Sequence, residues 1–208
     1  EQIISSLQQA IQVMLDPADC GPACISLSQD VQGEIYDYPE EFFKERLHTI
    51  RRPKPDDFQI KEAAELIKKS KKPIIIAGGG VFYSDATDEL SDFAKKHNIP
   101  VTQTVMGYSS IKKDHTHYLG TIGGLGGRAA NNLSKETDTA IAIGTKLADF
   151  TTGSWANFEN PNFKLISINA ARFDANKHMA QAVVGDAKVS LIELSQALGN
   201  WKADDNWY

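Results

Sequence analysis

The chain has 208 residues, 41% hydrophobic and 24% charged, which suits one globular domain with some additional structure. Its net charge of −5 argues against a broad cationic surface, so we expect neither nucleic acid nor an acidic membrane as a partner. No apolar run approaches the ~18 residues needed to cross a bilayer, and no signal-peptide pattern precedes the first predicted helix. These features predict a cytoplasmic protein.

Residues 1–38 hold too little regular structure for a domain of their own. A first helix is predicted from apolar residues at helical spacing: Ile3, Leu7, Ala10, Ile11 and Met14. Asp16-Pro17 should end this helix, and the segment PACISLSQDV (residues 22–31) is predicted to form a strand with its exit loop. One helix and one strand cannot bury a core, and the sequence starts without Met. We therefore expect residues 1–38 to complete a preceding domain.

Residues 39–58 are polar and proline-bearing and are predicted to form a linker. The basic cluster from Arg51 to Lys54 is interpreted as part of this solvated linker. Residues 200–208 are too polar to extend a core and are predicted to begin a second linker.

Two groups of potential metal ligands are predicted to have other roles. Cys20 and Cys24 are spaced C-x3-C with no second Cys or His pair nearby, so both are predicted to be reduced rather than zinc-bound. His115 and His117 are predicted to lie in a polar loop, because only Asp114 accompanies them.

Residues 59–199 alternate between amphipathic helices and short apolar strands. The predicted helices cover residues 60–67, 85–97, 125–134 and 187–198, and the predicted strands cover residues 73–77, 99–103, 138–143 and 163–168. Short strands that are apolar throughout are typical of a parallel sheet covered on both faces. The pattern therefore predicts an α/β domain with a doubly wound, Rossmann-like parallel sheet.

The predicted strands end in glycine-rich or small polar loops, and these ends should meet in a crevice where a ligand could bind. The first strand runs into three glycines in KPIIIAGGGV (residues 72–81). The dinucleotide pattern G-x-G-x-x-G is broken by Tyr83, and no acidic residue follows the second strand, which argues against an NAD dehydrogenase. Ser84 could cap the following helix, and Asp85 and Asp88 would satisfy its positive end. A tightly packed corner is thus favoured over a phosphate-binding turn.

Five segments in a fixed order resemble the central domain of thiamine diphosphate enzymes, the family that includes acetolactate synthase and pyruvate oxidase. They are KPIIIAGGGV, IPVTQTVMG, LGTIGGLGGRAAN, AIGTKLADFTTG and VVGDAKVSLIEL. Each segment alone is a weak signal, whereas the ordered set is specific. The resemblance implies a central domain that supports a larger enzyme and contains no catalytic residue.

A narrower resemblance comes from residues 15–53 and from SINAARFDANKH (residues 167–178). Both are similar to the thiamine-dependent hydrolases of myo-inositol catabolism, which open the ring of a trihydroxycyclohexanedione to give 5-deoxyglucuronate. The alternative is a nucleotide-binding domain, for ADP or FAD, in a carboligase or decarboxylase resembling acetolactate synthase.

This resemblance implies thiamine diphosphate and Mg2+ as cofactors of a longer, homo-oligomeric enzyme, a dimer or tetramer. Residues 1–38 would end its pyrimidine-binding domain, and residues 200–208 would lead to its diphosphate-binding domain. The cofactor-activating glutamate would precede Glu1. The Gly-Asp-Gly motif would follow Tyr208, since Gly185-Asp186-Ala187 lacks the last glycine. The 208 residues alone are therefore expected to be inactive and to bind neither cofactor.

The resemblance also assigns residues to the central crevice, which holds FAD or ADP in some relatives. Carried over one by one, they are Gly78, Gly79, Gly80, Thr104, Met106, Gly144, Thr145, Asp149, Asn169, Gly185 and Asp186. Phe150 replaces an arginine of the flavin-binding relatives, and Asn169 replaces an acidic ribose ligand. Both departures argue against FAD. Asp149 and Phe150 are also candidates for a minor role near the substrate channel.

Overall fold

A computed structural model describes all residues, 1–208, and divides the chain into two compact units, Glu1–Arg51 and Arg52–Tyr208. Each unit is described by itself. None of the helices combines the length and apolar content needed to span a membrane.

The first unit contains one α-helix and two short 3-10 helices, α1 (Ile3–Leu15), η1 (Val31–Gly33) and η2 (Glu40–Phe43). The carboxylate of Asp16 accepts N–H bonds from Ala18 and Asp19, and these bonds turn the chain away at the end of α1. No residue of α1 is buried. Cys20 and Cys24 are exposed free thiols.

The predicted strand at residues 22–31 is wrong. Residues 21–28 have no regular structure, and η1 follows them. A strand needs a neighbour to pair with its N–H and C=O groups, and the unit provides none.

The second unit begins with α2 (Asp57–Lys69), whose first turn is capped by the Asp56 carboxylate accepting from the Phe58 N–H. Lysines in the last turn of α2 complement its dipole. The apolar face predicted from residues 60–67 is buried, which confirms this helix.

Six parallel strands form the sheet in the order β3-β2-β1-β4-β5-β6. Their bounds are β1 Pro73–Ala77, β2 Val101–Gln103, β3 Tyr118–Thr121, β4 Thr139–Ile143, β5 Lys164–Asn169 and β6 Gln181–Val184. The order reverses between β1 and β4, as in a doubly wound fold. The predicted fold class is confirmed, although the prediction missed β3 and β6.

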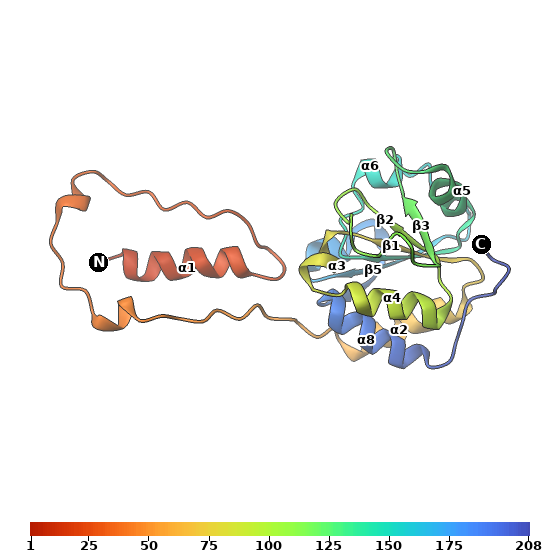
Figure 1. Ribbon diagram of the computed structural model, residues 1–208, viewed down its shortest axis with the longest axis horizontal. Coiled ribbons are helices and arrows are strands. Elements are labelled where there is room, and N and C mark those ends of the chain that lie inside the picture. The colour runs from red at the N-terminus through yellow and green to blue at the C-terminus, as the bar shows by residue number, and fades with distance from the viewer. The chain divides into compact units, whose positions relative to one another are not determined.

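Helices cover both faces of this sheet (Figure 1). Their bounds are α3 Gly79–Tyr83, α4 Thr87–His97, α5 Arg128–Glu136, α6 Asp149–Thr152, α7 Arg172–Ala175, η3 Lys177–Met179 and α8 Ala187–Leu198. In Figure 1, α2, α4 and α8 lie below the sheet and α5 and α6 lie above it.

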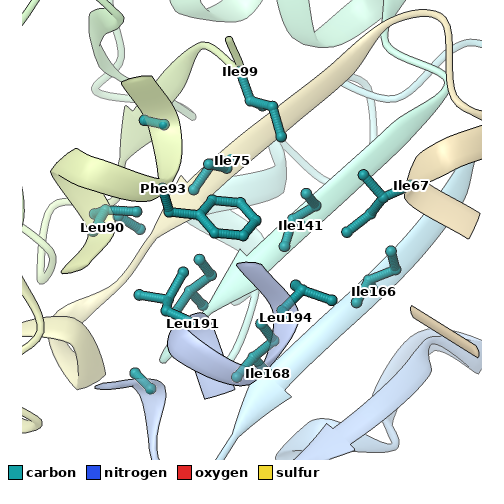
Figure 2. Close-up of a cluster of buried hydrophobic side chains, with 14 of the residues drawn as sticks. Ile67, Ile75, Leu90, Phe93, Ile99, Ile141, Ile166, Ile168, Leu191 and Leu194 are labelled. Atoms are coloured by element: carbon teal, nitrogen blue, oxygen red, sulfur yellow. The ribbon is translucent and has the colours of Figure 1, made fainter. Parts of the chain in front are cut away.

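The larger apolar cluster lies on the face covered by α2, α4 and α8. Figure 2 shows Phe93 of α4 and Leu194 of α8 beside Ile75 and Ile141 of the two central strands. Ile74 and Ile76 have the opposite orientation and belong to the second cluster. All five residues of β1 and all five of β4 are buried, which explains why these strands are apolar throughout.

The helix predicted at residues 85–97 begins later than expected. The chain forms α3 directly after Gly78, turns at Asp85 with a left-handed φ of 53°, and starts α4 at Thr87. Ser84 is therefore the C-terminal cap residue of α3 and not the N-cap of a long helix.

The C-terminal tail packs against the domain, contrary to the expectation that it could not extend the core. Ala203 and Trp207 are buried. The Ala203 N–H donates to the His97 carbonyl at 2.9 Å, and the Trp207 indole N–H donates to the Pro73 carbonyl at 2.8 Å. Two apolar side chains and a few specific hydrogen bonds thus hold a largely polar segment in place.

Candidate functional site

The candidate site is the carboxyl edge of the sheet where the strand order reverses. The triple glycine follows β1, and Gly144-Thr145 follows the adjacent strand β4. Thr104 and Met106 follow β2, which flanks β1, and Asn169 ends β5, which flanks β4. The structure therefore brings these predicted residues to four neighbouring strand ends.

The first and third loops cross in direct contact. The Gly80 N–H donates to the Gly144 carbonyl at 2.9 Å, and the Gly78 N–H donates to the Ile143 carbonyl at 2.8 Å. A Cβ atom built on Gly78 would lie 2.5 Å from the Thr145 Cβ, and one built on Gly80 would lie 2.6 Å from the Gly144 Cα. Side chains are excluded because two backbones occupy this space.

These contacts bear on anion binding. A phosphate at a helix N-terminus needs free N–H groups, but those of Gly78 and Gly80 are donated to backbone carbonyls, and that of Val81 is donated to the Gly78 carbonyl at 3.2 Å. The geometry favours the tightly packed corner over a phosphate-binding turn.

The prediction that Ser84, Asp85 and Asp88 satisfy the start of the helix after the glycines is wrong. The first turn of α3, which follows the glycines, contains no acidic residue, and Asp88 lies in the first turn of α4 instead. The Ser84 hydroxyl accepts from the Ala187 N–H at the start of α8. The occupied N–H groups of Gly78, Gly80 and Val81, and not neighbouring carboxylates, argue against a phosphate here, although the Gly79 N–H has no backbone partner.

Polar side chains at the other loops are also engaged within the chain. The Thr104 hydroxyl accepts from the Gly107 N–H at 2.9 Å, and the Thr145 hydroxyl accepts from the Leu147 N–H at 3.2 Å. The Asn169 amide donates to the Thr145 carbonyl at 3.3 Å and accepts from the Ala171 N–H at 3.0 Å. Asn169 thus connects the loops after β4 and β5.

Three of the candidate residues named from the sequence present their side chains to solvent at this edge: Met106, Asp149 and Phe150. Phe150 lies beside the β3 loop, because its carbonyl accepts from the Gly124 N–H at 2.8 Å. These side chains, rather than the closely packed glycines, are available for contact with another molecule or another part of a longer chain.

Gly185 and Asp186 follow β6, the outermost strand beyond β5, and the Gly185 N–H donates to the Asn169 carbonyl at 3.0 Å. The Asp186 carboxylate caps α8 by accepting from the Lys188 and Val189 N–H groups at 3.0 and 3.2 Å. Arg52 forms an ion pair with the same carboxylate at 3.2 Å.

The basic cluster is therefore not a freely solvated linker, contrary to the sequence interpretation. Arg52 donates to the Ser84 carbonyl as well as to Asp186, and the side chain of Lys54 pairs with Asp57 and Glu193 at 3.4 and 3.3 Å. No sequence pattern indicates these partners, which lie up to 139 positions away in the chain.

Metal ligation finds little support in these residues. No three His, Cys, Asp or Glu side chains gather closely enough to hold a metal ion. The His115 and His117 rings lie 5.5 Å apart, and His117 hydrogen-bonds the Tyr208 hydroxyl. Burial, and then the nearby His115, lower the pKa of His117, which disfavours its charged form. This pair helps to attach the C-terminal tail.

Sequence reasoning missed two further glycines of this edge, Gly107 and Gly123. A Cβ on Gly107 would collide with the Ala77 carbonyl, and one on Gly123 would collide with the Phe150 carbonyl. Their positions in loops that follow strands were the available signal, because close backbone approach is a common reason for glycine there.

A separate groove of about 500 Å³ lies between α2 and α8 and is lined by Ile60, Ala64, Lys68 and Gln196, among others. It contains none of the residues predicted for the site. The Lys68 ammonium donates to the Ala197 carbonyl at 2.8 Å across the groove. The groove belongs to the packing of two helices and lies away from the strand ends.

Comparisons with known proteins agree with this architecture. A family model described as "Thiamine pyrophosphate enzyme, central domain" matches residues 60–194. The solved structure of benzoylformate decarboxylase from Polynucleobacter necessarius matches with a TM-score of 0.64 at 20% identity, over 85% of this chain and 32% of that one. An X-ray structure from Mycobacterium smegmatis, provisionally described as a thiamin diphosphate-dependent enzyme, matches with a TM-score of 0.73 at 21% identity, over 100% and 39%. These two likenesses show the fold.

Curated relatives are more similar in sequence. The 3D-(3,5/4)-trihydroxycyclohexane-1,2-dione hydrolase of Clostridium perfringens strain 13 is 48% identical over 198 residues, 95% of this chain and 31% of the relative. The hydrolase of the same name from Bacillus licheniformis is 46% identical over 204 residues, 98% of this chain and 32% of the relative. The chain thus spans about a third of the length of the curated relatives it matches.

Proposed function

Because this chain belongs to the family of thiamine pyrophosphate enzyme central domains, we propose that it is the central, mainly structural part of a longer thiamine diphosphate-dependent hydrolase. The proposed reaction of the full-length enzyme is the ring opening of 3D-(3,5/4)-trihydroxycyclohexane-1,2-dione to 5-deoxyglucuronate in myo-inositol catabolism. The proposed location is the cytoplasm, and the proposed assembly is a homo-oligomer, a dimer or tetramer.

One observation carries the substrate assignment. Identity of 46–48% to hydrolases of this name extends over 95% or more of the chain, whereas the family model covers only residues 60–194. The similarity therefore includes residues outside the shared central domain, and this extent supports the proposed assignment to this branch of the family.

We propose that the 208 residues comprise parts of three domains. Residues 1–38 end a pyrimidine-binding domain, residues 39–58 connect it to the central domain, residues 59–199 form that domain, and residues 200–208 begin the connection to a diphosphate-binding domain. The unit boundary at Arg51 falls inside the proposed first connection. The exposed apolar face of α1 also suits a helix that completes another domain.

Thiamine diphosphate and Mg2+ belong, in this proposal, to the domains outside these residues. A diphosphate-bound Mg2+ needs converging oxygen ligands. Asp186 lies in Gly185-Asp186-Ala187, the segment most similar to the Gly-Asp-Gly motif, but it does not fit the role of a Mg2+ ligand. Asp186 is only 4% exposed, and its carboxylate caps α8 and pairs with Arg52. We accordingly assign no catalytic step to residues of this chain.

The role that the geometry supports is that of a rigid scaffold. The hydrogen bond from Gly80 to Gly144 and the one from Asn169 to Thr145 fix neighbouring loops relative to one another. Exposed side chains at these loops are therefore held in fixed positions. The engaged donors at the glycine turn weigh against the alternative of an ADP or FAD site. Purification of the chain with stoichiometric flavin would favour that alternative.

The test is an activity assay on two proteins. The full-length protein should open the ring of the trihydroxycyclohexanedione when thiamine diphosphate and Mg2+ are supplied, and activity should disappear when both are removed by dialysis against a chelator. The 208-residue chain should be inactive and should give no calorimetric signal with thiamine diphosphate. Cofactor binding by the 208 residues alone, or a full-length protein inactive on this substrate, would contradict the proposal.

A further inference from the structure

Exposed apolar side chains follow the carboxyl ends of five neighbouring strands. One residue from the segment after each strand defines what we call the carboxyl-edge rim: Tyr83 after β1, Met106 after β2, Leu125 after β3, Phe150 after β4 and Phe173 after β5. Each of the five is 71–79% exposed. Clusters of exposed apolar groups on one face of a domain mark interaction surfaces more often than isolated ones do.

Segments of the rim are in contact with one another. The Met106 carbonyl lies 3.0 Å from the position of a Cβ on Gly79, four residues before Tyr83. The Gly124 N–H donates to the Phe150 carbonyl at 2.8 Å, which brings the loop of Leu125 beside Phe150. The rim is therefore held by backbone contacts between loops.

The opposite edge of the sheet has a different composition. Lys71-Lys72 precedes β1, and Asp138 precedes β4, where its carboxylate accepts from the Ser70 hydroxyl and the Lys71 N–H. Large exposed apolar side chains elsewhere in the unit, such as Phe58 on α2 and Ile192 on α8, lie singly on helices. The apolar exposure is thus concentrated at the carboxyl edge.

The polypeptide enters the second unit beside this edge. Arg52 donates to the carbonyl of Ser84, the residue after Tyr83, and pairs with Asp186, which follows β6. The Pro53 carbonyl also accepts from the Asp186 N–H at 2.8 Å. The first residues of this unit therefore lie next to the rim.

The polypeptide leaves at the other edge. Trp207 donates to the carbonyl of Pro73, the first residue of β1, at 2.8 Å. Sequence beyond Tyr208 thus starts from the amino-terminal edge, on the far side of the sheet from the rim. A tethered segment has a high effective concentration near its attachment point, which favours an upstream occupant.

We propose that the carboxyl-edge rim is a docking surface for the part of the full-length polypeptide that precedes Glu1. The inference rests on the proposed function, since it requires a longer chain, and the curated relatives are about three times the length that this chain covers. Aromatic and methionine side chains are typical of the buried centre of a stable interface. Docking would remove these five side chains from water.

Photo-crosslinking in the full-length protein tests the proposal. Benzoylphenylalanine at Phe173 should, on irradiation, form an intramolecular crosslink that mass spectrometry maps to sequence before Glu1. The same probe at Phe58, which is 66% exposed on α2, is the matched control and should give at least about tenfold less of that product. A probe at Tyr83 repeats the test should the Phe173 variant fold poorly.

Methionine oxidation provides a second readout without substitution. Met106 and Met179 are both exposed, and Met179 lies away from the rim, two residues before β6. Relative to Met179, Met106 should be oxidised by dilute peroxide about tenfold more slowly in the full-length protein than in the 208-residue chain. Equal relative rates in the two proteins would overturn the proposal.

Other occupants give different products. Crosslinks to sequence beyond Tyr208, or a product of twice the mass from a second copy, would overturn the upstream assignment. Neither readout requires cofactor or substrate. An inactive full-length protein with the expected crosslink would contradict only the hydrolase assignment, and an active one without it would contradict only the docking surface.

Discussion

Gly80 and Gly144 lie in backbone contact at the point where the strand order reverses. The Gly80 N–H donates to the Gly144 carbonyl at 2.9 Å, and a Cβ on Gly144 would lie 2.5 Å from the Gly80 Cα. Gly144 also has a left-handed φ of 58°. The two residues close the corner that a nucleotide phosphate would need to enter.

Replacing Gly144 by Ala should destabilise the domain by about 2–4 kcal/mol. Overpacking at such a contact costs about 1–3 kcal/mol, and the left-handed backbone adds about 1 kcal/mol for a residue with a Cβ. Urea unfolding followed by circular dichroism measures the change. Gly124→Ala is the matched control, because a Cβ there meets only ordinary contacts of 3.6 Å or more. Equal midpoints for the two variants would contradict the packed corner.

Replacing Ile75 by Asp should unfold the domain. Ile75 is fully buried on the central strand β1 and packs among the isoleucines of the larger cluster (Figure 2). An unpaired charge at this position has no partner to offset its desolvation. The variant should lose its cooperative thermal transition, while Ile192→Asp, at an exposed position of α8, should keep it. A melting temperature like that of the parent would show that β1 is misassigned.

Asp186→Ala should lower stability by about 1–2 kcal/mol, the usual contribution of a helix N-cap. The carboxylate caps α8 through the Lys188 and Val189 N–H groups. Asp186→Asn should recover most of this loss, since asparagine caps equally well, even though it weakens the ion pair with Arg52. If Asn were as destabilising as Ala, the charge on Asp186 and not the cap would be the main contribution. Chemical unfolding of both variants makes the comparison.

His97 should make the attachment of the C-terminal tail sensitive to acid. Its ring is buried, donates from Nδ1 to the Trp201 carbonyl at 2.8 Å, and lies 3.2 Å from the Ser195 hydroxyl. Burial is the main cause that lowers the pKa of His97, and the nearby Lys96 and Lys202 lower it further. The neutral form is therefore favoured in the folded protein.

The sign of the effect follows from proton linkage. As the pH falls, His97 in the unfolded chain takes up a proton near the usual histidine pKa of about 6.5. In the folded chain it takes up the proton only at a lower pH. The contribution of His97 to stability is thus fully present above the pKa of the unfolded state and decreases as the pH falls toward the lowered pKa of the folded state.

His97→Asn keeps a donor for the Trp201 carbonyl but does not titrate. This variant should lose less stability than the parent between pH 7.5 and 5.0, and an equal loss in both would exclude His97 as the cause. His117, whose pKa is lowered in the same direction, accounts for part of the remaining dependence.

The sequence by itself determined the class of fold. Strands such as β1 and β4 are apolar at every position because both faces of the sheet are covered, and amphipathic helices such as α2 bury only one face. These patterns are local, so they can be read from the residues. The four loops of the predicted crevice also follow from this reading, since parallel strands bring their carboxyl ends to one edge.

Only the tertiary structure decided how that edge is used. β3 is short and half-buried, and β6 is four residues long, so neither has enough pattern to identify it. Several interactions join residues that are distant in sequence. They are the hydrogen bonds that Gly80 and Asn169 donate to other loops, the ion pair of Arg52 with Asp186, and the hydrogen bond from Trp207 to Pro73. A residue's type shows what it can bind, but its partner depends on which segments the fold brings together. For that reason the sequence could assign residues such as Gly80 and Asn169 to a ligand site, while the structure shows Gly80 bonded to Gly144 and Asn169 bonded to Thr145.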